Sequence, residues 1–404
     1  MPPASPVILT LNGGSSSIRF GVYRFGVALE RQVHGKLDRI GLPNSSLHVS
    51  DADGASHDHD FSSAKDFPSA TKALLDWLDA ESIFRTLSAV GHRVVHGTRH
   101  TEPAIVTADL LDELRSREWS DPDHLPGEID LMDAVRAHAP ALPQVACFDT
   151  SFHQGMPRVA MLLAIPRRLE AKGVRRYGFH GLSYAYLIEE LAHAAGPSVA
   201  HGRVILAHLG NGASVAAVQG GKSIDTSMGF TPASGLPMGT RSGDIDPGLA
   251  LYLEKTEQMT PGQIDTMLNH ESGLLGISET SSDMRDLLAR EATDSRAADA
   301  VAVFCYQAKK WVGAYAAALG GLDTLVFAGG IGENAPQVRA RICEGLGFLG
   351  IEIDPSRNAA NAGVISTEAS QVSVRVIRTD EELMIARAVC QVVGYRAPTG
   401  EVLP

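Results

Sequence analysis

The chain alternates short apolar runs with turns that are rich in glycine, serine and asparagine. Residues 7–11 are apolar, residues 12–17 read Asn-Gly-Gly-Ser-Ser-Ser, and residues 18–23 alternate apolar with polar positions. This pattern predicts a strand, a turn and a returning strand. The same pattern recurs over residues 204–218, with a turn from His208 to Gly212. One such unit near the start of each half indicates an internal structural duplication.

The hydrophobic periodicity predicts further helices and strands around these two units. Helices are expected over 67–80, 108–119, 126–137 and 296–319, and again after Asn334. Strands are expected over 89–95, 144–148 and 324–328, with a turn over 329–332 and a loop over the polar stretch 51–60. Strands that alternate with helices in two similar halves are typical of an α/β protein.

Size and charge narrow this picture. A chain of 404 residues exceeds what one hydrophobic core usually supports, so two domains are expected. Hydrophobic residues make up 44% and charged residues 20%, which is an ordinary globular balance. The formal net charge of −12 argues against a nucleic acid or an anionic membrane as a partner.

The cysteines and the apolar runs favour a cytoplasmic protein. The four cysteines are Cys147, Cys305, Cys343 and Cys390. They are widely spaced and form no Cys-x-x-Cys pair, so reduced and mostly buried thiols are expected. No apolar stretch reaches membrane-spanning length without a glycine or a charge, and the first residues lack the basic segment of a signal peptide.

The two glycine-rich turns suit the binding of phosphate groups. Glycines at the end of a strand let the backbone approach a ligand and direct several N–H groups toward one point. Arg19 follows the first turn, and Arg241 follows the second within a segment of small and hydroxyl residues. An arginine among glycines is a permanently charged, bidentate anion ligand. A polar hairpin is the alternative for the first turn alone, but the twin turn favours phosphate binding.

Three further motifs carry side chains that suit a small acid. In the segment GHRVVHG, Arg93 and Val95 fall on one side of an extended chain, which suits a carboxylate with a short alkyl tail; a surface arginine is the alternative. Asp149 follows a predicted strand, where ligand clefts form in α/β sheets, although such an aspartate is often only a turn former. His180 lies between glycines that permit close approach of a ligand, whereas a lone histidine is more often structural.

Polar stretches in the second half are less specific. The segment GGIGEN at 329–334 lies between a predicted strand and a predicted helix and can take the flat face of a nucleotide. It is neither a Walker loop nor a GxGxxG motif. The stretches 282–285 and 379–382 look like helix starts with capping and dipole-compensating acids.

Together these motifs resemble the acetate kinase family of the acetokinases. The match runs in order over nearly the whole chain, through LNGGSSSIRF, GHRVVHG, FDTSFHQGMP, RRYGFHG, HLGNGASVAAV, GTRSGDIDPG, FAGGIGENA and TDEELMIAR. The resemblance implies an α/β, two-lobed, duplicated actin-like ATPase (ribonuclease H-like) fold with an active-site cleft between the lobes. It implies an N-terminal lobe of 1–150 plus 383–404 with the acyl site, and a nucleotide-binding lobe of 151–382.

The resemblance also implies the reaction and the residues that carry it. The reaction is reversible transfer of the γ-phosphate of ATP to acetate, giving acetyl phosphate and ADP, with Mg²⁺ (or Mn²⁺) and in a homodimer. The catalytic positions match Asp149, His180 and Arg241. The acyl site matches Arg93 and Val95, and the metal site matches Asn12 and Glu381. The nucleotide-binding positions match Arg19, His208, Leu209, Gly210, Asn211, Gly212, Asp283, Met284, Arg285, Gly330, Ile331, Gly332, Glu333 and Asn334.

Four positions depart from the family pattern. Arg19 stands where the family usually has lysine, which keeps the charge but changes its geometry. Asp123 replaces an apolar residue of the acetate methyl pocket, so a change in the size and polarity of that pocket is expected. Leu182 and Tyr184 replace the usual threonine and histidine after the Phe-His-Gly segment, and a reshaped mouth of the site is expected from them.

Direct in-line phosphoryl transfer is expected, because a carboxylate oxygen is already ionised and needs no general base. Arg93 would hold the acyl group, and Asp149 would act through the metal and through positioning. His180 and Arg241 would donate to the equatorial oxygens of the phosphoryl group. One alternative is a kinase for a longer acid such as propionate or butyrate. The other is a non-catalytic ATP-binding protein, which the presence of all four side chains argues against.

Overall fold

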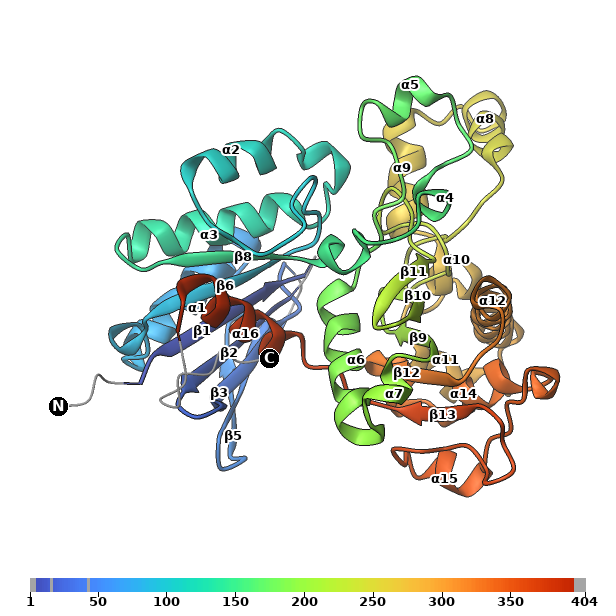
Figure 1. Cartoon of the computed structure of the whole chain (residues 1–404). Coiled ribbons are helices and arrows are strands. Elements are labelled where there is room, and N and C mark those ends of the chain that lie inside the picture. The colour runs from blue at the N-terminus through green and yellow to red at the C-terminus, as the bar shows by residue number, and fades with distance from the viewer. Residues whose placement is uncertain (1–4, 15–16, 42–43, 396–404) are drawn as a thin grey trace. The chain divides into compact units, whose positions relative to one another are not determined.

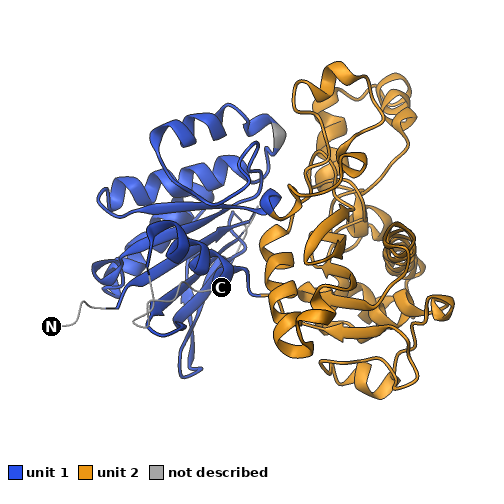
Figure 2. Cartoon of the chain, in the orientation of Figure 1, with its two compact units in different colours: residues 1–151, 380–404 blue, residues 152–379 orange. Residues whose placement is uncertain are grey.

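The structure, a computed structural model, describes residues 5–14, 17–41 and 44–395. The chain forms two compact units, residues 1–151 with 380–404 and residues 152–379, shown in Figure 2. Residue 151 and residues 380–382, expected in the second unit, belong to the first. Asp380 caps the helix α16 (Glu381–Val393), and this helix packs on the sheet of the first unit.

The described part of the first unit contains an eight-stranded sheet in the order β5-β4-β3-β2-β1-β6-β8-β7. Its strands are β1 (Val7–Gly13), β2 (Ile18–Phe25), β3 (Leu29–Asp38), β4 (Ser46–Asp51), β5 (Ser56–Asp60), β6 (Ala89–Val94), β7 (Ala104–Ile105) and β8 (Gln144–Phe148). The strands predicted over 7–11, 18–23, 89–95 and 144–148 are confirmed. Asn12 and Gly13, expected in a turn, continue β1 and pair with Arg19 and Ile18 of β2.

The loop predicted over 51–60 is wrong for most of its length. Residues 56–60 form the edge strand β5, which pairs antiparallel with β4. The strand reads Ser-His-Asp-His-Asp and has no apolar side chain, so its sequence carries no hydrophobic alternation. Backbone pairing holds the strand in place, and His48 Nδ1 lies 2.7 Å from Asp58 Oδ1 across the pair. Charged side chains on an edge strand also discourage pairing with another chain.

Helices cover both faces of this sheet (Figure 1). On one face, α1 (Phe67–Ala80) and α3 (Leu125–His138) pack on a core that includes Val90 of β6. The next residue, Gly91, points to the opposite face, because alternate residues of a strand face opposite ways. A Cβ atom on Gly91 would lie 2.4 Å from a methyl carbon of Ile385 and 2.6 Å from one of Val389, both in α16. Glycine at this position therefore lets α16 approach the sheet.

One helix of the first unit ends earlier than predicted. The expected helix over 108–119 is α2 (Ala108–Arg115), followed by the 3₁₀ turn η2 (Glu118–Ser120). The hydroxyl of Ser116 donates to the Glu113 carbonyl at 2.6 Å, and Arg117 leaves helical geometry with φ −116° and ψ 4°. A serine hydroxyl that bonds to the preceding turn competes with the helical hydrogen bond. The helices predicted over 67–80 and 126–137 are confirmed as α1 and α3.

The second unit repeats the strand plan of the first. Its strands are β9 (Arg203–Leu209), β10 (Ala213–Gln219), β11 (Lys222–Thr226), β12 (Thr324–Ala328) and β13 (Ser373–Val376), in the order β11-β10-β9-β12-β13. β9 pairs antiparallel with β10 and parallel with β12, which pairs parallel with β13. The run β3-β2-β1-β6-β8 has the same order and the same directions. The predicted duplication is therefore present in the topology.

The helices of the second unit are α4 (Arg158–Met161), α5 (Arg167–Glu170), α6 (Gly181–Ala195), α7 (Pro197–Ala200), α8 (Pro247–Thr256), α9 (Pro261–His270), α10 (Gly273–Ser278), α11 (Met284–Arg290), α12 (Ser295–Leu319), α13 (Gly329–Asn334), α14 (Pro336–Cys343) and α15 (Pro355–Ala359). Of these, α6 and α12 pack on the five-stranded sheet, whereas α8 and α9 pack on each other. Shorter 3₁₀ turns are η1 (Phe84–Thr86) in the first unit, η3 (Asp149–His153) at the boundary and η4 (Gly347–Leu349) in the second. The long helix predicted over 296–319 is confirmed as α12, which ends at Gly320 in the left-handed conformation.

The turn predicted over 329–332 is wrong, because these residues begin the helix α13. Arg339 of the next helix donates from Nη1 to the carbonyls of Gly332 and Glu333 at 2.8 and 3.0 Å. These bonds come from outside the segment and stabilise a helical turn that its three glycines would disfavour. The helix predicted after Asn334 is confirmed as α14, with Pro336 in its first turn.

The thiols match the prediction from their spacing. All four cysteines are free and buried. Burial raises the pKa of Cys305 to about 11 and the pKa of Cys390 to about 12. Among the residues that the structure places, no helix combines the length and the apolar character needed to cross a membrane.

Candidate active site

Three polar side chains of the first unit follow adjacent parallel strands at one edge of the sheet. Asn12 lies near the end of β1, Arg93 near the end of β6, and Asp149 directly after β8. β6 pairs with both β1 and β8, so these strand ends are neighbours. Ligand sites in α/β sheets form at the carboxyl ends of the strands. The structure therefore brings three sequence-predicted residues together at such a position.

Arg93 lies at the centre of this cluster. Its Nε and Nη2 donate to Asp149 Oδ2 at 3.0 and 2.6 Å, and its Nη1 donates to Asn12 Oδ1 at 3.2 Å. The side chain of Arg93 is 14% exposed and that of Asp149 is fully buried. Burial acts to lower the pKa of Arg93, but attraction to Asp149 and Glu381 outweighs it and raises the pKa. The sequence predicted Arg93 as a substrate ligand and Asp149 as a catalytic residue, and the structure joins the two in one buried ion pair.

The two residues expected at the metal site are in direct contact. Asn12 Nδ2 donates to Glu381 Oε2 at 2.9 Å and to Glu382 Oε1 at 3.3 Å. Over residues 5–14, 17–41 and 44–395, no three His, Cys, Asp or Glu side chains are grouped as a metal site. Mg²⁺ prefers oxygen ligands, keeps several of its waters and is usually bound through one or two carboxylates. The oxygen donors of Asn12 and Glu381 fit that requirement.

Two charged groups flank this pair. Burial and the neighbouring Glu381 raise the pKa of Glu382, while the positive charge of Arg19 acts to lower it. Arg19 is exposed on β2 and pairs with Asn12 in the strand register. Arg19 is therefore placed beside the carboxylates of α16. Ser15 and Ser16 of the predicted phosphate turn lie outside the described residues.

Glu128 was not predicted as a site residue. This residue is 2% exposed in the first turn of α3, and both its carboxyl oxygens lie 3.1 Å from the backbone nitrogen of Val95, which donates to them. Burial, followed by the charge of Asp121, raises the pKa of Glu128 well above its usual value. Val95 itself is buried directly after β6. The only sequence signal was an acid in the first turn of a helix, and that pattern normally indicates a solvated, dipole-compensating residue.

In the second unit, His208 and Leu209, which were expected in the turn, continue β9 and pair with β10. The turn itself consists of residues 210–212 and contacts a later segment of the chain. Gly210 N donates to the Gly212 carbonyl at 3.0 Å, which closes the turn between β9 and β10. Gly239 N donates to the Asn211 carbonyl at 2.9 Å. A Cβ atom on Gly239 would lie 2.1 Å from Asn211 Oδ1, so a larger residue at this position would displace the Asn211 side chain.

His180 and Arg241 both reach this turn. A Cβ atom on Gly212 would lie 3.3 Å from His180 Nε2 and 3.9 Å from Arg241 Nη1. His180 adopts the left-handed conformation at φ 62°, directly before α6. Its ring stacks on His208 with ring centres 4.2 Å apart. The structure thus brings two predicted catalytic residues to the predicted phosphate-binding turn.

Two hydroxyl residues behind His180 were not singled out as site residues. His180 Nδ1 lies 2.8 Å from Ser214 Oγ, and Ser214 Oγ also hydrogen-bonds the hydroxyl of Tyr184. Tyr184 and Ser214 are both fully buried. Tyr184 therefore lies behind His180 and not at the mouth of the site, which corrects the expectation from its sequence position. A serine within an otherwise apolar strand was the available signal for Ser214.

Two other stretches were expected to bind the nucleotide. Gly329, at the start of α13, passes close to the end of β9. A Cβ atom added to Gly329 would lie 2.7 Å from the Leu209 carbonyl oxygen. Glu333 Oε1 accepts hydrogen bonds from the backbone nitrogens of Gly329 and Thr379 at 3.0 and 3.2 Å. The stretches 208–212 and 330–334 are therefore neighbours.

The stretch 283–285 begins a helix, as predicted. Asp283 caps α11 by accepting from the backbone nitrogen of Arg285 at 2.8 Å. Hydrogen bonds from the Arg285 side chain lower the pKa of Asp283. Met284 is buried, while Arg285 is exposed.

Comparison with known proteins gives one consistent answer. A model of the Acetokinase family matches residues 7–387. An acetate kinase of Rhodopseudomonas palustris is 45% identical over 392 residues, which covers 95% of this chain and 98% of that protein. An acetate kinase of Dictyoglomus thermophilum is 43% identical over 413 residues, covering 96% of this chain and 100% of that protein.

Solved structures give the same result. The Porphyromonas gingivalis acetate kinase has a TM-score of 0.84 at 36% identity, covering 96% of this chain and 100% of that chain. A propionate kinase from Francisella tularensis has a TM-score of 0.87 at 37% identity, with 95% and 98% covered. The predicted actin-like α/β fold with a duplicated sheet agrees with these neighbours. From the family match and these relatives, the chain belongs to the acetokinase family.

Proposed function

We propose that this chain is an acetate kinase, which transfers the γ-phosphate of ATP reversibly to acetate and gives acetyl phosphate and ADP. The buried cluster of Arg93, Asp149 and Asn12 at three adjacent strand ends is the observation that carries this proposal. It supplies a fixed guanidinium for a carboxylate and oxygen donors for a hard cation. The acetate kinases of Rhodopseudomonas palustris and Dictyoglomus thermophilum, similar over nearly the whole chain, support the choice of substrate.

The transfer is a single displacement in this proposal. A carboxylate oxygen of acetate bonds to the γ-phosphorus, and the bond from that phosphorus to the oxygen shared with the β-phosphate breaks, leaving that oxygen on ADP. No proton moves, so catalysis consists of alignment and charge stabilisation. Asp149 occupies the Nε–Nη2 edge of Arg93, so the acetate carboxylate would bind the Nη1–Nη2 end in exchange for the Asn12 contact.

Asn12 and Glu381 would hold Mg²⁺ through oxygen contacts that are largely mediated by its waters. The ion, when bound, neutralises negative charge on the nucleotide phosphates. Asp149 acts in this proposal by fixing the orientation of Arg93 and by adding negative charge beside the cation.

The second unit would bind the nucleotide, through the stretches 208–212, 283–285 and 330–334, and Arg19 of the first unit would add positive charge. His180 Nε2 and Arg241 Nη1, which both adjoin Gly212, would donate to the equatorial oxygens as charge spreads over them. Backbone N–H groups of the glycine turn add further donors without any change in protonation.

A direct assay tests the proposal. Incubation with MgATP, acetate and hydroxylamine should give acetohydroxamate by trapping of acetyl phosphate, and omission of acetate should abolish it. Arg93→Ala should lower kcat/KM for acetate by about a hundredfold or more, because a charge-assisted carboxylate contact is lost. Equal kcat/KM values for the two proteins would remove Arg93 from the site.

Propionate is the second candidate substrate. The similar Francisella tularensis structure is named a propionate kinase, and Asp123 occupies the position that the family resemblance assigns to the methyl pocket. Comparison of kcat/KM for acetate, propionate and butyrate decides between the two substrates. A methylene group in such a pocket changes binding by about 1–3 kcal/mol, which is easily measured.

The proposal extends to the setting of the enzyme. Four free, buried cysteines suit a reducing cytoplasm, and the net charge of −12 disfavours nucleic acids and anionic membranes as partners. The family resemblance implies a homodimer. Light scattering coupled to size-exclusion chromatography should give twice the chain mass of 42.9 kDa.

A further inference from the structure

We propose that Tyr184 is a positioning residue that determines which ring nitrogen of His180 carries the proton. This inference rests on the proposed function, in which His180 donates from Nε2. His180 Nδ1 lies 2.8 Å from Ser214 Oγ, and that oxygen also hydrogen-bonds the Tyr184 hydroxyl. Tyr184 and Ser214 are fully buried and His180 is 9% exposed, so water competes little for these contacts.

The direction of the proton chain follows from counting donors. A serine hydroxyl has one proton, so it can donate to only one of its two partners. A phenol is the more acidic hydroxyl and the better donor, so Tyr184 donates to Ser214 and Ser214 donates to His180 Nδ1. A neutral histidine that accepts at Nδ1 carries its proton on Nε2. Nε2 is the ring nitrogen that lies near Gly212, and Arg241 Nη1 lies near the same glycine.

The two neighbouring histidines, His208 and His153, have hydrogen-bond partners of their own and do not take the place of Tyr184. His208 stacks on His180, but its own Nδ1 lies 2.8 Å from the hydroxyl of Ser183, which also contacts Thr379. His153 meets the Tyr184 ring edge-on with its nitrogens on Ser223 and the Phe179 carbonyl, and burial lowers its pKa to about 4. His153 is thus neutral over the working range, and Tyr184 is the group that orders the Ser214 hydroxyl.

Tyr184→Phe isolates this role, because it removes one oxygen and keeps the ring. The variant should lose about ten- to hundredfold in kcat at neutral pH with little change in KM, since the neutral ring then divides between two tautomers. Ser214→Ala breaks the same chain of hydrogen bonds at its middle member and should show the same loss of kcat. Tyr315→Phe removes another buried hydroxyl and should leave kcat unchanged.

Two results would overturn the inference: an unchanged kcat in Tyr184→Phe, or the same His180 tautomer in Tyr184→Phe as in the unmodified protein. Nitrogen-15 NMR of the histidine rings provides a readout independent of catalysis. It should show a protonated Nε2 on His180 in the unmodified protein and a mixed tautomer in Tyr184→Phe. If the unmodified protein makes no acetyl phosphate, the proposed function fails while the NMR result still decides the proton position.

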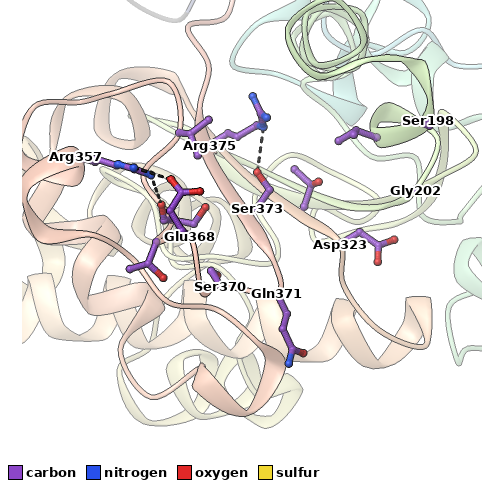
Figure 3. Close-up of a pocket in the computed structure, with 14 residues that line it drawn as sticks. Ser198, Gly202, Asp323, Arg357, Glu368, Ser370, Gln371, Ser373 and Arg375 are labelled. Carbon is purple, nitrogen blue, oxygen red and sulfur yellow. Dashed lines mark hydrogen bonds and ion pairs between the residues drawn. The ribbon is translucent and has the colours of Figure 1, made fainter.

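A pocket in the second unit lies at the end of the five-stranded sheet that is opposite the turn 210–212. The pocket has a volume of about 450 Å³ and lies where β9, β12 and β13 begin, whereas the turn 210–212 and α13 follow the ends of β9 and β12. Such a volume is within the range of small-ligand sites. Its hydroxyl-bearing residues, some of which Figure 3 labels, are Ser198, Thr324, Ser366, Thr367, Ser370 and Ser373.

Four charged residues line the pocket, and among the described residues one of them has no charged partner. Glu368 pairs with Arg357 at 2.7 Å, and Asp323 pairs with Arg203 at 2.5 Å. The remaining charged residue, Arg375, donates from Nε to Ser373 Oγ at 3.2 Å and has no carboxylate partner among the described residues. Burial lowers the pKa of Arg375, and no acidic group offsets that effect. Figure 3 shows Arg375 between the Arg357–Glu368 pair and Asp323.

We infer that this pocket binds a small organic anion through a carboxylate or phosphate group held by Arg375. A guanidinium pairs bidentately with either group, and the neighbouring hydroxyls can donate to the remaining oxygens. The volume exceeds that of inorganic phosphate alone, which leaves room for a short organic body.

Isothermal titration of the full chain with inorganic phosphate and with succinate tests this site. Arg375→Gln should weaken binding of at least one anion by about ten- to hundredfold, Arg375→Lys should weaken it less, and Arg168→Gln, an exposed arginine elsewhere, should not change it. Ser198→Glu at the exposed rim should weaken binding while leaving Arg375 in place, even if Arg375→Gln proves unstable. Binding of phosphate alone or succinate alone identifies the headgroup. Equal affinities in the unmodified protein, Arg375→Gln and Ser198→Glu would refute the inference.

Discussion

Asp149 and Arg93 form a buried ion pair in which one carboxylate oxygen accepts from both Nε and Nη2, at 3.0 and 2.6 Å. The two residues follow neighbouring strands, and their side chains are 0% and 14% exposed. A buried ion pair is costly to assemble, but it is still more costly to break from one side. Because removing either partner is so costly, the pair keeps the Arg93 guanidinium in one position for substrate binding in the proposed reaction.

The first prediction concerns this pair. Arg93→Met and Asp149→Leu should each lower the free energy of unfolding by about 3–5 kcal/mol, because each leaves a buried charge without a partner. The double variant should lose much less than the sum of the two. Urea denaturation of the four proteins gives the coupling energy, and additive losses would mean that the two charges do not stabilise each other. Acetate phosphorylation should be lost in all three variants.

The second prediction concerns Arg339, which is fully buried and donates to the carbonyls of Gly332 and Glu333 and to both oxygens of Asn358. Arg339→Met should destabilise the protein by about 2–4 kcal/mol, because those acceptors lose their donor. KM for ATP should rise more than KM for acetate, since α13 belongs to the predicted nucleotide site.

A matched control for Arg339 lies two residues away. Arg341 pairs with Glu291 at 2.8 Å, but its side chain is 39% exposed. Arg341→Met should therefore cost only about 0–1 kcal/mol. If thermal unfolding gave equal losses for the two variants, the hydrogen bonds to α13 would not be the cause.

The third prediction concerns Gly91, whose missing Cβ admits Ile385 and Val389 of α16. Gly91→Ala should destabilise the protein by about 1–3 kcal/mol through overpacking, and Val389→Ala in the same chain should recover part of the loss. Gly262→Ala is the comparison, since a Cβ there meets nothing within 4 Å in α9, and alanine favours helix. Calorimetry should show a lower Tm for the first variant and an equal or higher Tm for Gly262→Ala.

The hydrophobic pattern predicted most of the fold because apolar burial is repeated at regular spacing along each element. The strand 324–328 and the helix α1 match their predicted bounds, and most of the residues that each of them buries are apolar. The edge strand β5 could not be found in this way, since its five residues are all polar and only backbone pairing with β4 orders them. The helix α13 could not be predicted either, because its glycine-rich sequence disfavours a helix and Arg339 of the following helix stabilises it.

The candidate site likewise contains residues that sequence motifs predict and residues that only the fold brings into contact. Arg93, Asp149, His180 and Arg241 stand in motifs that point to a ligand, and the structure holds two of them at one sheet edge and two at one turn. Glu128 and Tyr184 give no such signal, since each lies in a helix and hydrogen-bonds a residue 33 or 30 positions away in the sequence. Contacts between residues far apart in sequence depend on packing, which a single sequence does not display.

The fourth prediction concerns Glu128. Its pKa is raised in the folded protein by burial and by Asp121, so the folded state holds the proton more tightly than the unfolded chain. Stability should therefore fall as the pH rises above the unfolded value of about 4.5, because the carboxyl must lose its proton while buried. Glu128→Gln keeps the shape of the neutral acid and has no proton to lose. Its advantage in urea denaturation over the unmodified protein should be absent near about pH 4 and grow toward about pH 8. A constant difference across that range would show that Glu128 ionises normally.

The last prediction concerns substrate size. Asp123 is half-buried two residues before α3 and, by family resemblance, stands at the methyl pocket. A carboxylate there disfavours a longer apolar tail, because the tail would remove water from the charge. Asp123→Leu should therefore raise kcat/KM for propionate relative to acetate by about five- to a hundredfold, while Asp123→Asn should change the ratio less. The ratio is measured with each acid in the hydroxamate assay at saturating MgATP. An unchanged ratio in Asp123→Leu would mean that the acyl tail does not contact Asp123. The side chains of Val95 and α3 would then determine which acids are accepted.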